Sequence, residues 1–271
     1  MIRRETESDF LLISQMAHAH LAAELAARFG NRAFAPYAAR VEGLSAIELH
    51  DAGWPTHDDA PSVNHHGKPT DVFEMPMEKS LHIWSLSTQR AIEANSYAGL
   101  LVSLHGLALS SRIKPERPTR AAAFALIKFQ HQQVEIQESM RKKLDLRTDL
   151  PLRNGLAELG RSASEDALLY DFRVLEFVDQ LSLNLCFDAA RIPSSGSVCA
   201  RLGAPPVICR IRREEDAAFV VQPWPFHADT LALEIPCRRI AARRYTGAAD
   251  LRHGIETGEE MTVTARLKRR S

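Results

Sequence analysis

The chain has 271 residues, and its hydrophobic and charged fractions of 45% and 25% are ordinary for a globular protein. Because 34 basic and 34 acidic side chains balance, no overall field attracts nucleic acid or a membrane surface. No apolar run approaches the roughly 18 residues that span a bilayer, and the four cysteines form no CxxC pair, which suits a reducing compartment. We therefore expect a cytoplasmic protein without nucleic-acid or membrane partners, whose oligomeric state the sequence leaves open.

The first two thirds of the chain have the apolar periodicity of helices. The first predicted helix runs from Ser8 to Phe29 and the second from Pro36 to Gly53. Four further segments with this periodicity cover residues 76–94, 97–113, 119–144 and 164–186. Residues 54–75, which are rich in proline, histidine and aspartate, predict a long polar loop that borders a binding site.

The pattern changes after Phe187, where glycine and proline interrupt the chain and β-branched residues begin to alternate with polar ones. Strands are predicted over residues 207–211, 218–222, 231–235 and 261–267. We therefore predict a mainly α protein. An all-helical domain would cover residues 1–190, and a small antiparallel β unit, packed on that domain, would cover residues 191–271.

Two polar residues fall on strongly apolar helix faces. Asp179 lies one turn from both Leu175 and Leu183, and a buried carboxylate must be paired, protonated or bound to a metal. His105 lies in the middle of the most apolar helix and faces the same requirement. Taken alone, each is explained by a hydrogen-bonded core histidine or by a carboxylate that caps a helix or pairs with an arginine.

Three more candidates strengthen the case for a metal. His18 and His50 also face inward by helical phase, and Asp51 adjoins His50. The five residues come from four predicted helices and point to one core, and imidazole with carboxylate suits iron, manganese or zinc. His82 is a sixth candidate whose orientation stays open, because its neighbours in helical phase are polar.

The order of these residues resembles the HD superfamily, helical proteins named for an adjacent His-Asp pair of metal ligands, and in particular a bacterial HD-like family of unknown function. The segments that carry the resemblance are residues 17–22, 48–54, 82–84, 97–105 and 179–183. The resemblance implies two divalent ions bridged by Asp51. The other ligands would divide between the ions, with His18, His50 and Asp179 on the first, and His82 and His105 on the second.

The resemblance implies a binuclear hydrolase that uses a metal-bridging water to cleave a phosphoester of a small molecule or nucleotide. Lys68 in the polar loop, and Arg112 seven residues after His105, are candidate catalytic contacts to the phosphate, beside Asp51. No GxSxG, GxGxxG or P-loop motif offers another mechanism. Two alternatives stay open: a diiron oxygenase that hydroxylates or cleaves a small substrate, and a non-catalytic protein whose metal only joins four helices.

Overall fold

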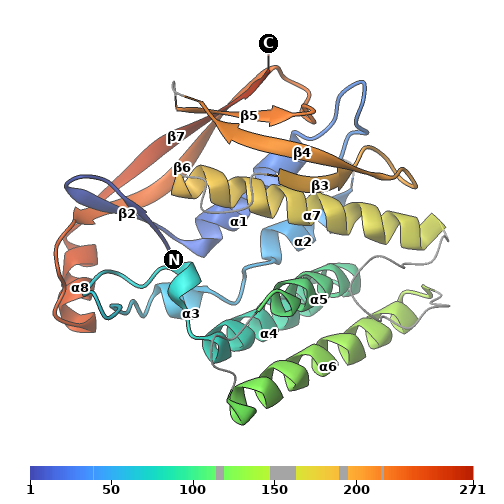
Figure 1. Ribbon diagram of the computed structural model, residues 1–271. Coiled ribbons are helices and arrows are strands. Elements are labelled where there is room, and N and C mark those ends of the chain that lie inside the picture. The colour runs from blue at the N-terminus through green and yellow to red at the C-terminus, as the bar shows by residue number, and fades with distance from the viewer. Residues whose placement is uncertain (39, 114–118, 147–162, 189–194, 215–216, 271) are drawn as a thin grey trace.

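A large sheet arches over two layers of helices (Figure 1). The computed structural model describes residues 1–38, 40–113, 119–146, 163–188, 195–214 and 217–270. The layer next to the sheet contains α1 (Gln15–Ala27), α7 (Ala163–Phe187) and, deeper, α2 (Val41–Leu49). The outer layer contains α4 (Met77–Ala94), α5 (Ser96–Ser111) and α6 (Arg120–Lys143). Helix α2 contacts α1, α5 and α7, so four helices converge below the sheet.

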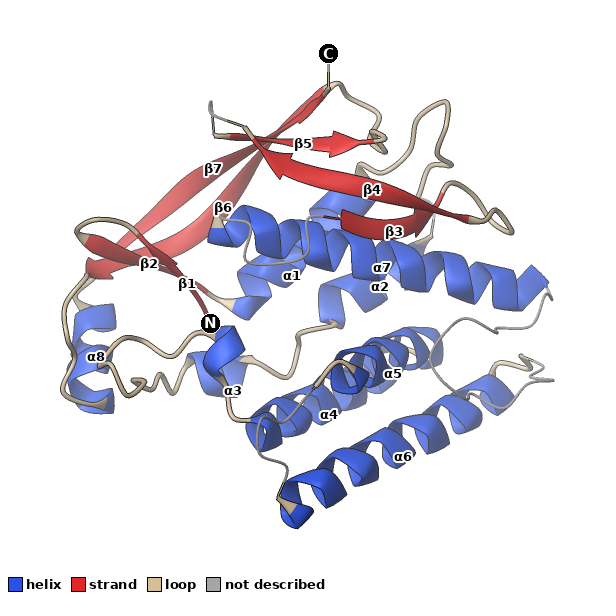
Figure 2. Cartoon of the chain, in the orientation of Figure 1, coloured by secondary structure: helices blue, strands red, loops and turns tan. Residues whose placement is uncertain are grey.

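The sheet has seven strands in the order β1-β2-β6-β7-β5-β4-β3, drawn in red in Figure 2. Their bounds are β1 (Ile2–Glu5), β2 (Asp9–Ile13), β3 (Ser195–Cys199), β4 (Pro206–Arg213), β5 (Ala218–Gln222), β6 (Thr230–Ala241) and β7 (Glu259–Arg269). Neighbouring strands are antiparallel except β5 and β7, which run parallel. The N-terminal hairpin joins the C-terminal strands through β2, whose Phe10 lies opposite Ile240 of β6.

The predicted fold class, mainly α with a small antiparallel β unit, is wrong, because the protein is an α+β fold built on a large mixed sheet. The difference begins at residues 9–13, which were predicted to open the first helix and instead form β2. Phe10, Leu11, Leu12 and Ile13 are all buried. A short run of consecutive apolar residues fits a helix stripe and a doubly buried strand equally well, so periodicity could not separate them.

Strands from both predicted domains lie in this one sheet, since β2 pairs with β6. The predicted boundary between residues 190 and 191 falls within residues 189–194, outside the described residues, as does the turn-rich stretch around residues 151–160. The polar loop contains two short elements, α3 (Pro55–Asp58) and the 3-10 helix η1 (Val72–Glu74). A helix that the sequence did not predict, α8 (Ala248–Glu256), packs against β6.

The helices that converge below the sheet are buried on most sides. Helix α5 buries nearly its whole N-terminal half together with His105, and α7 contributes fully buried residues such as Phe172 and Phe177 to the same core. Helix α6 differs, because it exposes Phe124 and Ile127. Within the described ranges, no helix combines the length and the apolar character needed to cross a membrane.

Candidate metal centre

Five of the six predicted ligands meet in the core where α1, α2, α5 and α7 converge. His18 comes from α1, His50 caps the C-terminus of α2 with Asp51 beside it, His105 comes from α5, and Asp179 from α7. Their side chains are buried, with exposed fractions between 1% for His18 and 13% for Asp179. We refer to these five residues as the His/Asp cluster.

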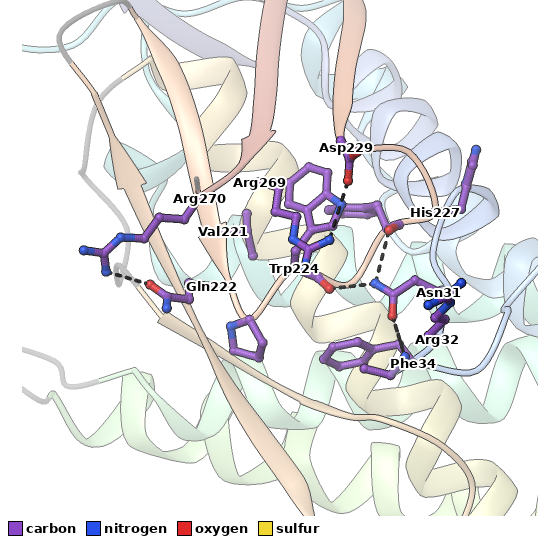
Figure 3. A pocket seen from close by; sticks show the side chains of 13 residues that line it. Asn31, Arg32, Phe34, Val221, Gln222, Trp224, His227, Asp229, Arg269 and Arg270 are labelled. Carbon is purple, nitrogen blue, oxygen red and sulfur yellow. Dashed lines mark hydrogen bonds and ion pairs between the residues drawn. The ribbon is translucent and has the colours of Figure 1, made fainter.

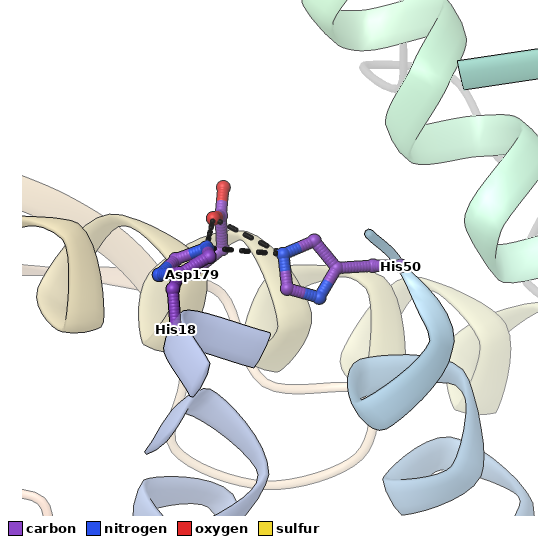
Figure 4. Close-up of side chains that lie close together, drawn as sticks. All are labelled: His18, His50 and Asp179. Atoms are coloured by element: carbon purple, nitrogen blue, oxygen red, sulfur yellow. Dashed lines mark hydrogen bonds and ion pairs between the residues drawn. The ribbon is translucent and has the colours of Figure 1, made fainter. Parts of the chain in front are cut away.

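Three of the five have the mutual spacing of ligands around one ion (Figure 4). His18 Nε2 lies 3.0 Å from Asp179 Oδ1, and His50 Nε2 lies 3.3 Å from His18 Nε2 and 3.4 Å from the same oxygen. Two ligand atoms that are each about 2.1 Å from a metal lie about 3.0 to 3.4 Å apart in octahedral or tetrahedral geometry. The group of His18, His50 and Asp179 could therefore hold a metal ion.

The other two members lie close enough to complete such a site. Asp51 Oδ2 lies 3.5 Å from His50 Nε2 and 3.6 Å from His18 Nε2. His105 Nε2 lies 3.6 Å from Asp179 Oδ2. The cluster thus offers three imidazoles and two carboxylates, a set of nitrogen and oxygen donors typical of zinc, manganese and iron sites.

Neighbouring groups fix the protons of two imidazoles. His50 Nδ1 lies 2.6 Å from the carbonyl oxygen of Ile47 and must donate to it. The Ser182 hydroxyl donates to the carbonyl of Asp179, so its oxygen accepts from His18 Nδ1 at 2.9 Å. In the neutral rings, both Nε2 atoms therefore carry lone pairs that face each other and Asp179. Such an arrangement requires a proton or a metal ion between them.

Asp51 is also held in place. The Trp54 indole N–H donates to Asp51 Oδ1 at 3.1 Å, which leaves Oδ2 directed at the two histidines. The turn that carries Asp51 packs tightly on α4, because a Cβ on Gly53 would lie 2.1 Å from the carbonyl oxygen of Ile83. Only glycine fits this close approach, which is why the sequence places Gly53 two residues after Asp51.

Burial and neighbouring charges shift the pKa values of several groups in the cluster. Burial opposes protonation of His50, but the carboxylates of Asp51 and Asp179 raise its pKa to about 9. Burial lowers the pKa of His105 to about 3, so this ring is neutral, and burial raises the pKa of Asp51. A divalent ion with neutral imidazoles would balance the carboxylates of Asp51 and Asp179.

The remaining predicted residues lie outside the cluster. His82 is exposed on α4, near His57, and none of the contacts made by the described residues links it to the cluster. Lys68 is also remote from the cluster, because its ammonium lies 2.7 Å from Glu5 Oε2 beside the N-terminal hairpin. Arg112, at the end of α5, lies near the cluster and binds Glu176 of α7.

The sequence analysis missed the residues that orient the ligands. Ser182 follows Asp179 by three residues, and Trp54 follows Asp51 by three. Both spacings place a hydrogen-bonding group one helical turn from a candidate ligand, a signal that could have been read from the sequence. The carbonyl of Ile47 carries no such signal, because every residue has one.

A cavity of about 560 Å³ reaches the cluster at Asp179. Its size falls within the usual range for small-molecule sites, roughly 300 to 1,000 Å³. Arg112, Arg173 and Glu176 lie in its wall beside apolar side chains that include Trp84. We refer to this cavity as the cluster-side pocket.

A second cavity, of about 620 Å³, lies between the α1–α2 connection and the loop after β5 (Figure 3). Its polar groups bind one another: Asn31 donates to the carbonyl of Trp224 at 2.7 Å, and Arg270 donates to Gln222 at 3.0 Å. It contains no member of the His/Asp cluster. The cluster-side pocket is therefore the better candidate for a substrate site.

Comparison with known proteins gives a family without an assigned activity. Residues 1–242 match the family described as "Protein of unknown function (DUF3891)", which shows that the chain belongs to this family. No match was found among curated proteins or among solved structures. The expected relationship to the HD superfamily is contradicted, because the family model that matches describes a family of unknown function and the fold contains a large curled sheet. The whole of the cluster and of the cluster-side pocket lies within the matched residues.

Proposed function

We propose that this protein is a metal-dependent hydrolase that cleaves a phosphoester of a small molecule. One divalent ion would be held by His18, His50 and Asp179. The observation that carries the proposal is a buried cluster with the spacing of metal ligands that opens, at Asp179, into a pocket lined by two arginines. The pocket also favours catalysis over a metal that only joins helices, since a purely structural site would be closed to ligands.

Each residue of the cluster has a part in this proposal. A divalent ion at this position supplies a Lewis acid and a bound water whose pKa is lowered toward neutrality. Ser182 and the Ile47 carbonyl keep the Nε2 lone pairs of His18 and His50 directed at the ion. Asp51 Oδ2 completes the ligands. Arg112 in the pocket wall provides positive charge for the phosphate oxygens.

The number of ions follows from the position of His82. We propose one tightly held ion, because a second ion bridged by Asp51 would require His82 to turn inward from its exposed position on α4. Zinc, manganese and iron all suit the donors. The chemistry needs no protein nucleophile, and the four cysteines are free but buried.

Metal analysis of the purified chain tests the proposal. We expect about one metal ion per chain in the wild type, a loss of bound metal in His50→Ala and Asp51→Ala, and no change in His82→Ala. Unchanged metal content in His50→Ala and Asp51→Ala would contradict the proposed centre. Phosphoester hydrolysis stimulated by zinc or manganese would support the hydrolase, whereas bound iron with an oxygen-dependent colour change would favour an oxygenase instead.

A further inference from the structure

One face of α7 forms the floor of the cluster-side pocket. Arg173, Glu176, Gln180 and Leu183 recur at spacings of three and four residues and all line the cavity, with Asp179 among them. Asp179 is the residue of the floor that belongs to the metal centre. Glu176 lies three residues earlier, about 4.5 Å along the helix axis. A group of the size of a phosphate can therefore reach the metal centre with one oxygen and the next turn of α7 with another.

The charged side chains around Glu176 carry one positive charge in excess. Arg112 Nη2 binds Glu176 Oε1, and Arg173 Nη1 lies 3.4 Å from Glu176 Oε2. Each guanidinium has five N–H donors, so most of them stay available to a ligand. Two arginines against one glutamate give a net charge of one. With a divalent ion balancing Asp51 and Asp179, the pocket as a whole suits a ligand with one negative charge.

One wall of the pocket is apolar. It is formed by Trp84, Leu109 and Ile113, with Phe73 at the rim, and residues 195–197 of β3 also line the cavity. Phe73 is 58% exposed, and it stacks on Phe187 with ring centres 5.4 Å apart. A large aromatic side chain that stays exposed at a rim contributes little to folding, but it can cover an apolar group of a bound ligand.

We infer that the substrate is a singly charged phosphodiester with at least one apolar substituent of aromatic size, an inference that rests on the proposed phosphoester hydrolysis. The phosphate lies between the metal centre and the Arg112–Glu176–Arg173 group, and the substituent lies against Trp84, Leu109 and Phe73. Hydrolysis adds the elements of water across one P–O bond. The products are a phosphomonoester and the free alcohol or phenol, which takes up the proton.

Three phosphate esters separate the effect of charge from that of the apolar group. Diphenyl phosphate carries one charge and two rings, phenyl phosphate is mainly doubly charged with one ring, and dimethyl phosphate carries one charge and no ring. We expect calorimetry on the full-length chain with zinc to give diphenyl phosphate a Kd about tenfold or more below that of dimethyl phosphate, because burying a phenyl group contributes that much. Its Kd should also lie below that of phenyl phosphate, whose second negative charge has no partner in the pocket. Equal or tighter binding of phenyl phosphate or dimethyl phosphate would overturn the inference.

Two variants assign the binding to this pocket. Arg173→Gln should weaken diphenyl and dimethyl phosphate by a similar factor, about tenfold, since both lose a charged contact. Phe73→Ala should weaken diphenyl phosphate several-fold and leave dimethyl phosphate unchanged, because only the former has a ring to cover. Arg243→Gln is the matched control, since Arg243 binds Asp250 at 2.6 Å on α8, outside the pocket. If neither pocket variant differs from this control, the assignment is wrong.

The outcome for the ligand is distinguishable from the outcome for the proposed function. If no phosphoester is hydrolysed while the preference for diphenyl phosphate holds, the hydrolase proposal fails and the ligand class stands. If phosphomonoesters are hydrolysed while diphenyl phosphate binds no better than dimethyl phosphate, the hydrolase proposal stands and the ligand class fails.

Discussion

Helix α7 carries two carboxylates in very different surroundings. Asp171 is fully buried and is bound by Arg40 through both oxygens and by the Tyr97 hydroxyl at 2.6 Å. Asp179, about 12 Å further along the helix, faces the ring nitrogens of His18 and His50 instead. The protein itself supplies a full positive charge for Asp171. For Asp179 it supplies imidazole nitrogens in place of a guanidinium.

The comparison teaches which buried carboxylate points to function. Burying a charge is tolerated when a partner of opposite charge and enough hydrogen bonds accompany it, as at Asp171. Where imidazoles alone face the carboxylate and a pocket adjoins, as at Asp179, a bound metal ion is the compensating charge that we propose. Burial alone does not separate the two, because Asp171 is the more buried of the pair.

The largest effect is expected at Asp171. Asp171→Asn should lower the free energy of unfolding by about 3 kcal/mol, since it leaves one partner of a buried ion pair behind. The loss should lie at the lower end of the range for such pairs, because the Arg40 side chain is 28% exposed and can be rehydrated. Chemical denaturation measures the change. Metal content should stay at the wild-type level, and a loss of metal in this variant would break the distinction between the two carboxylates.

Asp179→Asn should have the opposite effects: it should abolish metal binding and leave the stability of the metal-free protein almost unchanged. It leaves Asp51 and a protonated His50 as a balanced pair, so the metal-free protein should keep its stability within about 1 kcal/mol. Zinc at a free concentration 100-fold above its Kd should stabilise the wild type by about 2.7 kcal/mol. It should stabilise Asp171→Asn by the same amount and Asp179→Asn not at all, as measured by thermal unfolding with and without zinc. Stabilisation of Asp179→Asn by zinc would remove this residue from the proposed ligands.

Asp171 and Asp179 show how much of the site could be predicted from the sequence. Helical phase indicated that Asp179 and His105 face the core, and the structure leaves only 13% and 4% of their side chains exposed. Phase could not show that the partner of Asp171 is Arg40, which lies 131 positions away in the chain and on a different element. Separating a carboxylate that is paired with an arginine from one that faces imidazoles requires the tertiary structure.

The fold was predicted less well than the positions of the inward-facing residues. The long helices were predicted to within a few residues, because their apolar stripes persist over several turns. Strand β2 was not predicted, because its five residues fit a helix and a strand equally well. The connection between the N-terminal hairpin and the C-terminal strands was therefore not predicted either. Pairing in a sheet between residues over 200 positions apart leaves no local pattern in a single sequence.

A smaller effect is expected from the group that orients His18. Ser182→Ala removes the acceptor of the His18 Nδ1 proton, so the ring is free to change tautomer and metal affinity should fall by about 10- to 100-fold. Ser103→Ala is the matched control, since Ser103 is equally buried and hydrogen-bonded but binds Gln133 and Gln137 on α6. Metal titration by calorimetry should separate the two. An equal loss of affinity in both variants would mean that Ser182 acts only through packing.

The smallest effect concerns Glu74, a second carboxylate that the protein compensates internally. Burial opposes its ionisation, but hydrogen bonds from Arg3, the Asp71 backbone N–H and Asn64 lower the pKa of Glu74 to about 2. Because an unfolded glutamate titrates near 4.5, the unfolded chain binds more protons between these values. The stabilisation is therefore present above about pH 4.5 and is lost as the pH falls toward 2.

The free energy of unfolding, measured across this range, should fall less steeply with pH in Glu74→Gln than in the wild type. The exposed Glu256→Gln should behave as the wild type does. If the free energy of unfolding of Glu74→Gln fell with pH as steeply as that of the wild type, the hydrogen bonds to Glu74 would not stabilise its ionised form. Of the two carboxylates, only Asp171 would then be stabilised by groups of the protein itself.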